Sequence, residues 1–267
     1  RDLHSFPTRR SSDLVQLGQK AITDTLENAI ANDHLAQALL FTGPRGVGKT
    51  TCARILAKKI NEKTTPTEGD NDFAFNIFEL DAASNNSVEG IRSLIEQVRI
   101  PPQVGKYKVY IIDEVHMLST GAFNALLKTL EEPTENVVFI LATTELHKIP
   151  AIILSRVQRF EFKSIKTQDI IGHIEWILER EGIDFEQEGV QIIARRAEGG
   201  MRDALSILDQ ALSLTQENRL TTDIAEEITG SISLGALDAY VAALIAHDAV
   251  TADRKSTRLN SSHGSAS

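Results

Sequence analysis

The stretch GPRGVGKT, residues 43–50, has the residue types and spacing of a phosphate-binding loop. It follows the apolar run AQALLFT and precedes the run KTTCARILAKKI, which we expect to be helical. Glycines let backbone N–H groups close around phosphates, and the N-terminus of a helix attracts negative charge. Lys49 supplies a positive charge, and Thr50 offers a hydroxyl to Mg²⁺. The candidate nucleotide-binding residues here are Gly43, Pro44, Arg45, Gly46, Val47, Gly48, Lys49, Thr50 and Thr51.

Two adjacent carboxylates, Asp113 and Glu114, follow the apolar run 109–112. Such a run is typical of a strand in a parallel sheet covered on both faces, and these sheets bind ligands at the carboxyl ends of their strands. Beside a bound triphosphate, Asp113 could hold Mg²⁺, directly or through water, and Glu114 could activate the attacking water. A solvated strand end is the plainer interpretation, and the phosphate-binding loop upstream argues against it.

Three further residues are candidates with plainer alternatives. Thr144 follows Thr143 at the end of the next apolar run, where it could orient the attacking water or simply end a strand. Arg156, in LSRVQRF, could act as an arginine finger toward another subunit's nucleotide, although a surface arginine is the better interpretation on the residues alone. Arg202, in EGGMRDALSILDQ, opens a helical run after two glycines, as many helices do.

The elements that must position these residues alternate between strand and helix in the first part of the chain. The patterns predict strands at 37–42, 75–82, 109–112, 136–144 and 157–162. They predict helices at 17–30, 49–60, 85–98, 119–132 and 150–156, with Pro133 just past the end of the fourth, and a loop at 61–72. From residue 167 onward they predict three helices and a shorter fourth, with no strand between them, and Trp176 packing in an apolar stripe. This order predicts a parallel α/β domain followed by a helical domain.

Composition limits the class of protein. The chain has 267 residues, 42% of them hydrophobic, and no apolar run that approaches the ~20 residues of a membrane helix. Its net charge of −9 argues against a globally basic nucleic-acid binder and leaves room for a local basic surface. The single cysteine, Cys52, permits no internal disulfide, and we expect it to be a small core residue. His34, His116, His147 and His173 lack the spacing of metal ligands.

Several stretches together resemble the gamma/tau subunits of bacterial DNA polymerase III clamp loaders. They are FTGPRGVGKTTCARILAK, ELDAASNNSVEGIR, KVYIIDEVHMLSTGAFNALLKTLEEP, FILATTELHKIPAIILSR and GGMRDALSILDQ. The resemblance runs from about residue 18 to 230. It implies an α/β fold: a five-stranded parallel AAA+ core flanked by helices, a small helical lid domain and the start of a helical collar domain.

The resemblance also implies roles for single residues. Lys49 and Thr50 match the Walker A pair, Asp113 and Glu114 match Walker B, Thr144 matches sensor 1, Arg156 matches the trans-acting finger, and Arg202 matches sensor 2. It implies ATP and Mg²⁺ as ligands, with Thr50 and Asp113 on the metal. The implied partners are other clamp-loader subunits in a ring-like hetero-pentamer, the sliding clamp and the backbone of primed DNA, in the bacterial cytoplasm and not at a membrane.

The chain departs from the family's pattern in one place that concerns a metal. The family usually carries a four-cysteine zinc module after the phosphate-loop helix, and INEKTTPTEGDNDFAFNIFEL has no cysteine there, so we expect no zinc. We expect five regions: a foreign or disordered leader at 1–14, the AAA+ core at 15–165, the lid at 166–230, a truncated collar at 231–252, and a foreign or disordered tail at 253–267.

Three functional hypotheses follow. The first is an ATPase subunit that uses ATP binding and hydrolysis to load a sliding clamp onto primed DNA. The second is an AAA+ scaffold subunit that assembles without hydrolysing ATP, although Lys49 and Glu114 are both present. The third is a related branch-migration motor, which would need a winged-helix domain that no pattern after residue 230 suggests.

Overall fold

The computed structural model describes residues 19–64, 76–85, 87–98, 100–102, 106–215 and 218–230. The predicted leader at 1–14, collar at 231–252 and tail at 253–267 lie outside the described residues, as does most of the predicted loop at 61–72. The chain divides into two compact units, with the boundary between Ser164 and Ile165.

The first unit contains a five-stranded sheet in which every neighbouring pair of strands is parallel. Its strands are β1 (Ala38–Thr42), β2 (Ile77–Asp81), β3 (Lys108–Asp113), β4 (Val137–Thr143) and β5 (Gln158–Glu161), in the order β2-β3-β4-β1-β5. The predicted five-stranded parallel α/β fold is therefore confirmed.

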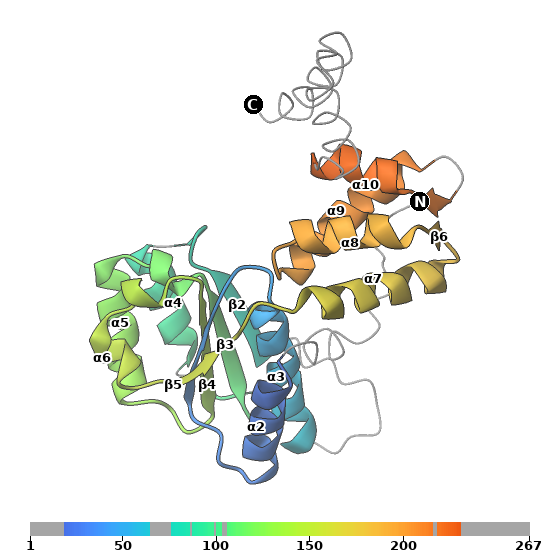
Figure 1. Ribbon diagram of the computed structural model, residues 1–267. Coiled ribbons are helices and arrows are strands. Elements are labelled where there is room, and N and C mark those ends of the chain that lie inside the picture. Colours follow the sequence, from blue (N-terminus) through green and yellow to red (C-terminus); the bar gives the residue numbers. More distant parts are fainter. Residues whose placement is uncertain are drawn as a thin grey trace, which may run out of the picture. The chain divides into compact units, whose positions relative to one another are not determined.

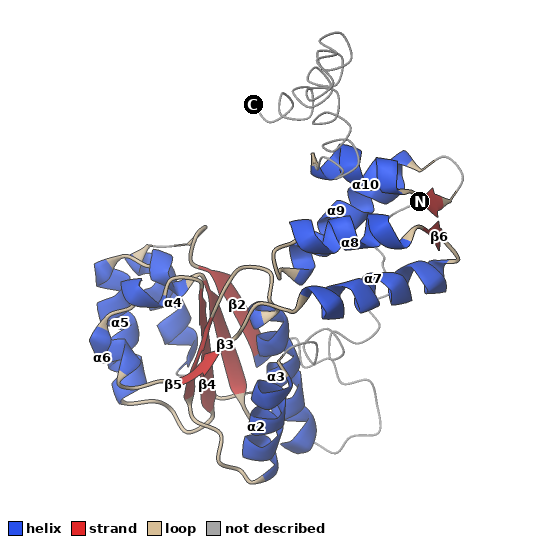
Figure 2. Cartoon of the chain, in the orientation of Figure 1, coloured by secondary structure: helices blue, strands red, loops and turns tan. Residues whose placement is uncertain are grey.

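Helices cover both faces of this sheet (Figures 1 and 2). One layer contains α2 (Lys20–Ala31) and α3 (Lys49–Thr64), and the other contains α4 (Val88–Val98), α5 (Thr120–Glu131) and the short α6 (Ala151–Leu154). Successive strand residues serve opposite layers: Leu39 packs with the α2–α3 side, and Leu40 with the α4–α5 side. The strands are apolar throughout because both faces of the sheet are buried.

The helix α3 continues to Thr64, past its predicted end at residue 60. Asn61 explains the extension, because its side chain is buried and bonded rather than exposed in a loop. Its amide donates to the Ala57 carbonyl at 3.4 Å, and its oxygen accepts from the Tyr107 N–H at 3.1 Å. A polar run can therefore remain helical where it makes such contacts.

Within residues 165–215 and 218–230, the second unit has four helices: α7 (Thr167–Glu181), α8 (Gln187–Arg196), α9 (Met201–Leu214) and α10 (Thr222–Thr229). The prediction that no strand interrupts them was wrong. The strand β6 (Asp184–Phe185) pairs in parallel with β7 (Arg219–Leu220). Each strand has only two residues, one polar and one apolar, which is too short for a periodic pattern to reveal.

Trp176 does not belong to the buried stripe of α7, contrary to the prediction. The buried side chains of this helix are Ile170, Ile171, Ile174, Ile177 and Leu178. Trp176 is 39% exposed and lies on another side of the helix. It stacks against His173 with ring centroids 5.6 Å apart, and the Arg180 guanidinium lies 4.6 Å from its ring.

Candidate nucleotide-binding site

The predicted phosphate-binding loop joins β1 to α3 at the carboxyl edge of the sheet. Three glycines of the loop have positive φ angles, which favour glycine: 139° at Gly43, 74° at Gly46 and 96° at Gly48. At Gly43 space is also limiting, because a Cβ atom there would lie 2.2 Å from the Phe162 carbonyl oxygen. The loop therefore begins in close contact with the segment that follows β5.

Lys49, the first residue of α3, is almost fully buried. Its Nζ donates to the carbonyl oxygens of Gly43 at 2.8 Å and Pro44 at 2.6 Å, so the ammonium lies against the loop. Burial lowers the pKa of Lys49, and the carboxylates of Glu114 and Asp113 act in the opposite direction. The lysine thus brings a positive charge to the loop, close to both predicted acidic residues.

Thr50 and Asp113 meet across the gap between α3 and β3. The Thr50 Oγ1 donates to the Asp113 Oδ2 at 2.5 Å, and the other Asp113 oxygen accepts from the Glu114 N–H at 2.8 Å. Two oxygen groups of the kind that Mg²⁺ prefers are therefore adjacent beside the phosphate loop.

Glu114 leaves the sheet with an uncommon backbone conformation. Its φ is 45° and its ψ is 44°, in the left-handed region that few residues other than glycine adopt. Such a conformation costs about 1–3 kcal/mol and is often found at functional sites. It turns the chain into the 3₁₀ helix η3 (Val115–Met117) directly after β3.

Thr144 contacts Glu114, because the two residues directly follow the neighbouring strands β4 and β3. Its Oγ1 donates to the Glu114 Oε2 at 3.1 Å. The strands β3 and β4 are parallel neighbours, so their carboxyl ends emerge side by side. The structure thus brings Lys49, Thr50, Asp113, Glu114 and Thr144 together at one edge of the sheet.

His116 also contacts this group, and sequence reasoning missed it. The His116 Nδ1 lies 3.3 Å from the Glu114 Oε2 and 3.0 Å from the Thr143 Oγ1. Its Nε2 lies 3.2 Å from the Glu145 Oε1. The spacing of the histidines along the sequence is not that of metal ligands and gives no sign of this contact. The available signal was its position two residues after the acidic pair.

Arg156 lies just after α6, in the layer opposite α3. Its Nη2 donates to the Glu131 Oε1 at 2.8 Å, and its Nη1 lies 3.4 Å from the Ile152 carbonyl oxygen. The preceding helix packs into the α4–α5 side of the core through Ile153, whereas α3 packs on the other side. These contacts keep Arg156 on the face of the sheet away from the chain's own α3.

Arg202 belongs to the second unit. It is exposed in the first turn of α9, directly after Gly200 and Met201. Gly199, with a φ of 87°, makes the turn that precedes this helix. Arg202 is thus an accessible cation at a helix start.

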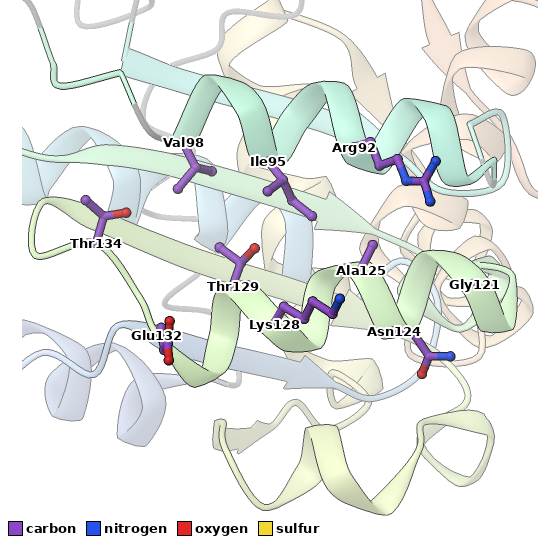
Figure 3. A pocket seen from close by; sticks show the side chains of 10 residues that line it. All are labelled: Arg92, Ile95, Val98, Gly121, Asn124, Ala125, Lys128, Thr129, Glu132 and Thr134. Atoms are coloured by element: carbon purple, nitrogen blue, oxygen red, sulfur yellow. The ribbon is translucent and has the colours of Figure 1, made fainter.

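A separate groove of about 640 Å³ lies between α4 and α5 (Figure 3). Its lining residues are Arg92, Ile95, Val98, Gly121, Asn124, Ala125, Lys128, Thr129, Glu132 and Thr134. None of them belongs to the phosphate loop, and their charges are of both signs. The groove is therefore distinct from the candidate nucleotide-binding site.

Comparison with known proteins gives two family matches. A family described as DNA polymerase III, delta subunit, matches residues 18–166, and one described as DNA polymerase III clamp loader subunit, ATPase lid domain, matches residues 169–217. The second match lies entirely within the second compact unit.

Curated relatives agree with these matches. The chain is 49% identical to DNA polymerase III subunit tau of Bacillus subtilis over 85% of its own length and 42% of that protein's. It is 42% identical to subunit tau of Escherichia coli over 81% of its length and 35% of that protein's. It is 41% identical to subunit gamma of Buchnera aphidicola subsp. Schizaphis graminum, with 76% and 59% covered. The chain thus spans less than half of either tau subunit.

Solved structures with the same fold include the RuvB Holliday junction branch migration motor of Thermotoga maritima. The TM-score is 0.62 at 18% identity, with 87% of this chain and 78% of that chain covered. This likeness extends to the fold alone. Among the described residues, no helix is long and apolar enough to cross a membrane.

Proposed function

The chain belongs to the family of DNA polymerase III clamp-loader subunits, and from this premise we propose that it is an ATPase subunit that loads a sliding clamp onto primed DNA during replication. The resemblance drawn from its motifs is confirmed at the level of the family. The observation that carries the proposal is the paired contact at the sheet edge, Thr50 with Asp113 and Glu114 with Thr144.

The phosphate loop is the proposed ATP site. Backbone N–H groups of residues 43–51 and the start of α3 would hold the phosphates, and the Lys49 ammonium would exchange its two carbonyl partners for phosphate oxygens. Thr50 and Asp113 would hold Mg²⁺, since their side-chain oxygens already lie 2.5 Å apart. When bound, Mg²⁺ offsets negative charge on the phosphate oxygens. We propose no zinc site.

Glu114 is the proposed general base. Thr144 contacts only one of its carboxylate oxygens, Oε2. The other oxygen, Oε1, would accept a proton from the water that attacks the γ-phosphate. Thr144 then fixes the orientation of the base and lies near enough to help place that water.

Arg156 is the proposed finger that acts on a neighbouring subunit's ATP, because it follows a helix on the sheet face away from its own α3. Arg202 is proposed as a second cation for the nucleotide, on the resemblance alone. Bound ATP would then join two subunits through Arg156, and hydrolysis would remove that link. The proposed assembly is a ring-like hetero-pentamer.

The remaining partners are a sliding clamp and primed DNA. With a net charge of −9, contact with DNA would be local and through the phosphate backbone, without sequence selection. The curated relatives are bacterial proteins, and we propose that this subunit works in the bacterial cytoplasm.

The test is ATP turnover by the chain mixed with the other loader subunits, clamp and primed DNA, with Lys49→Ala as the control. We expect turnover that DNA stimulates and Lys49→Ala abolishes, together with clamp retained on circular primed DNA. Turnover that is the same in both chains would refute the ATPase role and leave a scaffold. Strand separation without clamp retention would indicate a branch-migration motor instead.

A further inference from the structure

His116 lies behind the proposed base with both ring nitrogens in contact with polar groups. Its side chain is only 6% exposed, and it belongs to η3, the turn that Glu114 begins. One nitrogen faces Glu114 and Thr143, and the other faces Glu145. A buried imidazole between two carboxylates is more than a packing group, since each nitrogen has an acceptor within reach.

The imidazole is the hydrogen-bond donor in its contacts with the two carboxylates. Ionised carboxylates only accept hydrogen bonds, so a proton on Nδ1 would be shared between the Glu114 Oε2 and the nearer Thr143 Oγ1, and a proton on Nε2 would serve Glu145. The contact to Glu114 falls on Oε2, the same oxygen that accepts from Thr144. Two partners thus converge on Oε2, and Oε1 remains to accept a proton.

Glu145 is the outer end of this chain of contacts. It directly follows Thr144, and its N–H donates to the Thr143 Oγ1 at 3.0 Å. A hydrogen bond from Lys148 lowers the pKa of Glu145, and charge on His116 and His147 acts in the same direction. Glu145 is therefore a stable anion that can anchor the His116 Nε2 from the end of β4.

We propose that His116 is a positioning residue that holds the Glu114 carboxylate in its working orientation and anchors it, through Glu145, to the carboxyl end of β4. The proposal rests on the proposed function, because it takes Glu114 as the base. It adds a residue that touches neither nucleotide nor water and acts only through Glu114.

Two substitutions test the contacts of the two ring nitrogens of His116 one at a time. His116→Asn keeps a donor near the Nδ1 position, facing Glu114, and His116→Gln keeps one near the Nε2 position, facing Glu145. In the assembled loader we expect His116→Gln and His116→Ala to lower kcat about tenfold and His116→Asn to stay within about threefold of the parent, because a misplaced catalytic group costs rate rather than binding. The Kd for ATP should stay within about twofold, since the phosphate loop is unchanged.

His147→Gln is the matched control. His147 is 75% exposed and lies 3.6 Å from the same Glu145, at Oε2 rather than at the Oε1 that faces His116, so the kcat of His147→Gln should equal that of the parent. If His116→Asn is as slow as His116→Ala while both melt at the parent's temperature, the proposal is overturned. Should the His116 variants fail to fold, Glu145→Gln tests the outer anchor at a partly exposed site, and a His116 Nε2 resonance that does not respond to this change would overturn the proposal.

The imidazole signals test the contact without turnover. With ¹⁵N-labelled histidine, Glu114→Gln should shift the Nδ1 resonance of His116, and Glu145→Gln should shift its Nε2 resonance. Unmoved resonances would overturn the contact itself. If the parent turns over ATP no faster than Lys49→Ala while the resonances still respond, the proposed function is refuted and the contact stands.

Discussion

Arg156 donates from its Nη2 to the Glu131 carboxylate at 2.8 Å, so the residue proposed as a finger is held by the last residue of α5. The two side chains are 34% and 42% exposed. An exposed ion pair of this kind contributes about 0.2–1 kcal/mol, enough to orient the arginine but not to lock it. Arg156 can therefore exchange Glu131 for a phosphate at little cost.

Removing this arginine should separate binding from turnover. For Arg156→Ala we expect the isolated chain to bind ATP as the parent does, because Arg156 lies away from its own loop. Turnover in the assembled loader should fall about 10³-fold, the lower end for an arginine finger. Nucleotide titration and steady-state turnover measure the two effects. Arg159→Ala, a nearby exposed arginine on β5, is the control, and equal turnover in both variants would refute the finger role.

Gly43→Ala should damage both the loop and the fold. The new Cβ would lie 2.2 Å from the Phe162 carbonyl oxygen at a φ of 139°, so we expect a loss of at least about 2 kcal/mol in the free energy of unfolding. ATP binding should be lost as well. Gly172→Ala in α7 is the matched control, because nothing lies within 4 Å of its added Cβ. That variant should gain about 0.5–1 kcal/mol. Urea denaturation compares the two, and similar changes would contradict the steric argument.

The lowered pKa of Lys49 predicts a pH dependence of stability. Between the folded-state pKa and the ordinary value of 10.5, the unfolded chain binds the extra proton, so stability rises with pH across that interval. Lys49→Met has no such proton. Without nucleotide, the difference in the free energy of unfolding between the parent and Lys49→Met should therefore move in favour of the parent as the pH rises toward 10.5. Parallel curves would show that burial does not disfavour the charged lysine.

Cys52 should be unreactive while the chain is folded. It is buried in α3, and burial raises the pKa of its thiol to about 12. The thiolate is the reactive form, so little of it exists at pH 8. We expect iodoacetamide to leave the native chain unmodified and to alkylate one site in urea, as read by mass spectrometry. Rapid alkylation of the native chain would mean that α3 opens readily from the sheet.

The sequence predicted the strands well because the sheet is buried on both faces. Residues 109–112 are apolar at every position, and a run of that kind has few alternatives. The same logic predicted that Asp113, Glu114 and Thr144 would lie at one edge. The two-residue strands β6 and β7 were missed because pairing over so short a length leaves no pattern.

The contacts among side chains were beyond sequence reasoning. The link from His116 to Glu114 depends on the left-handed turn at Glu114, where φ is 45°. No composition rule predicts such a turn at a glutamate. The pairing of Arg156 with Glu131 joins residues 25 positions apart, one at the end of α5 and the other just after α6, and it depends on how these two helices are placed.

Gln19 and Phe162 tie the exit of β5 to the start of the phosphate loop. The Gln19 amide donates to the Lys163 carbonyl at 2.6 Å and accepts from the Lys163 N–H at 3.3 Å, while the Phe162 N–H donates to the Thr42 carbonyl at 2.7 Å. The chain reaches the second compact unit two residues after Lys163. These hydrogen bonds join the segment after β5 to the residues that open the loop, so a displacement of residues 162–163 would have to move Thr42 and Gly43 as well.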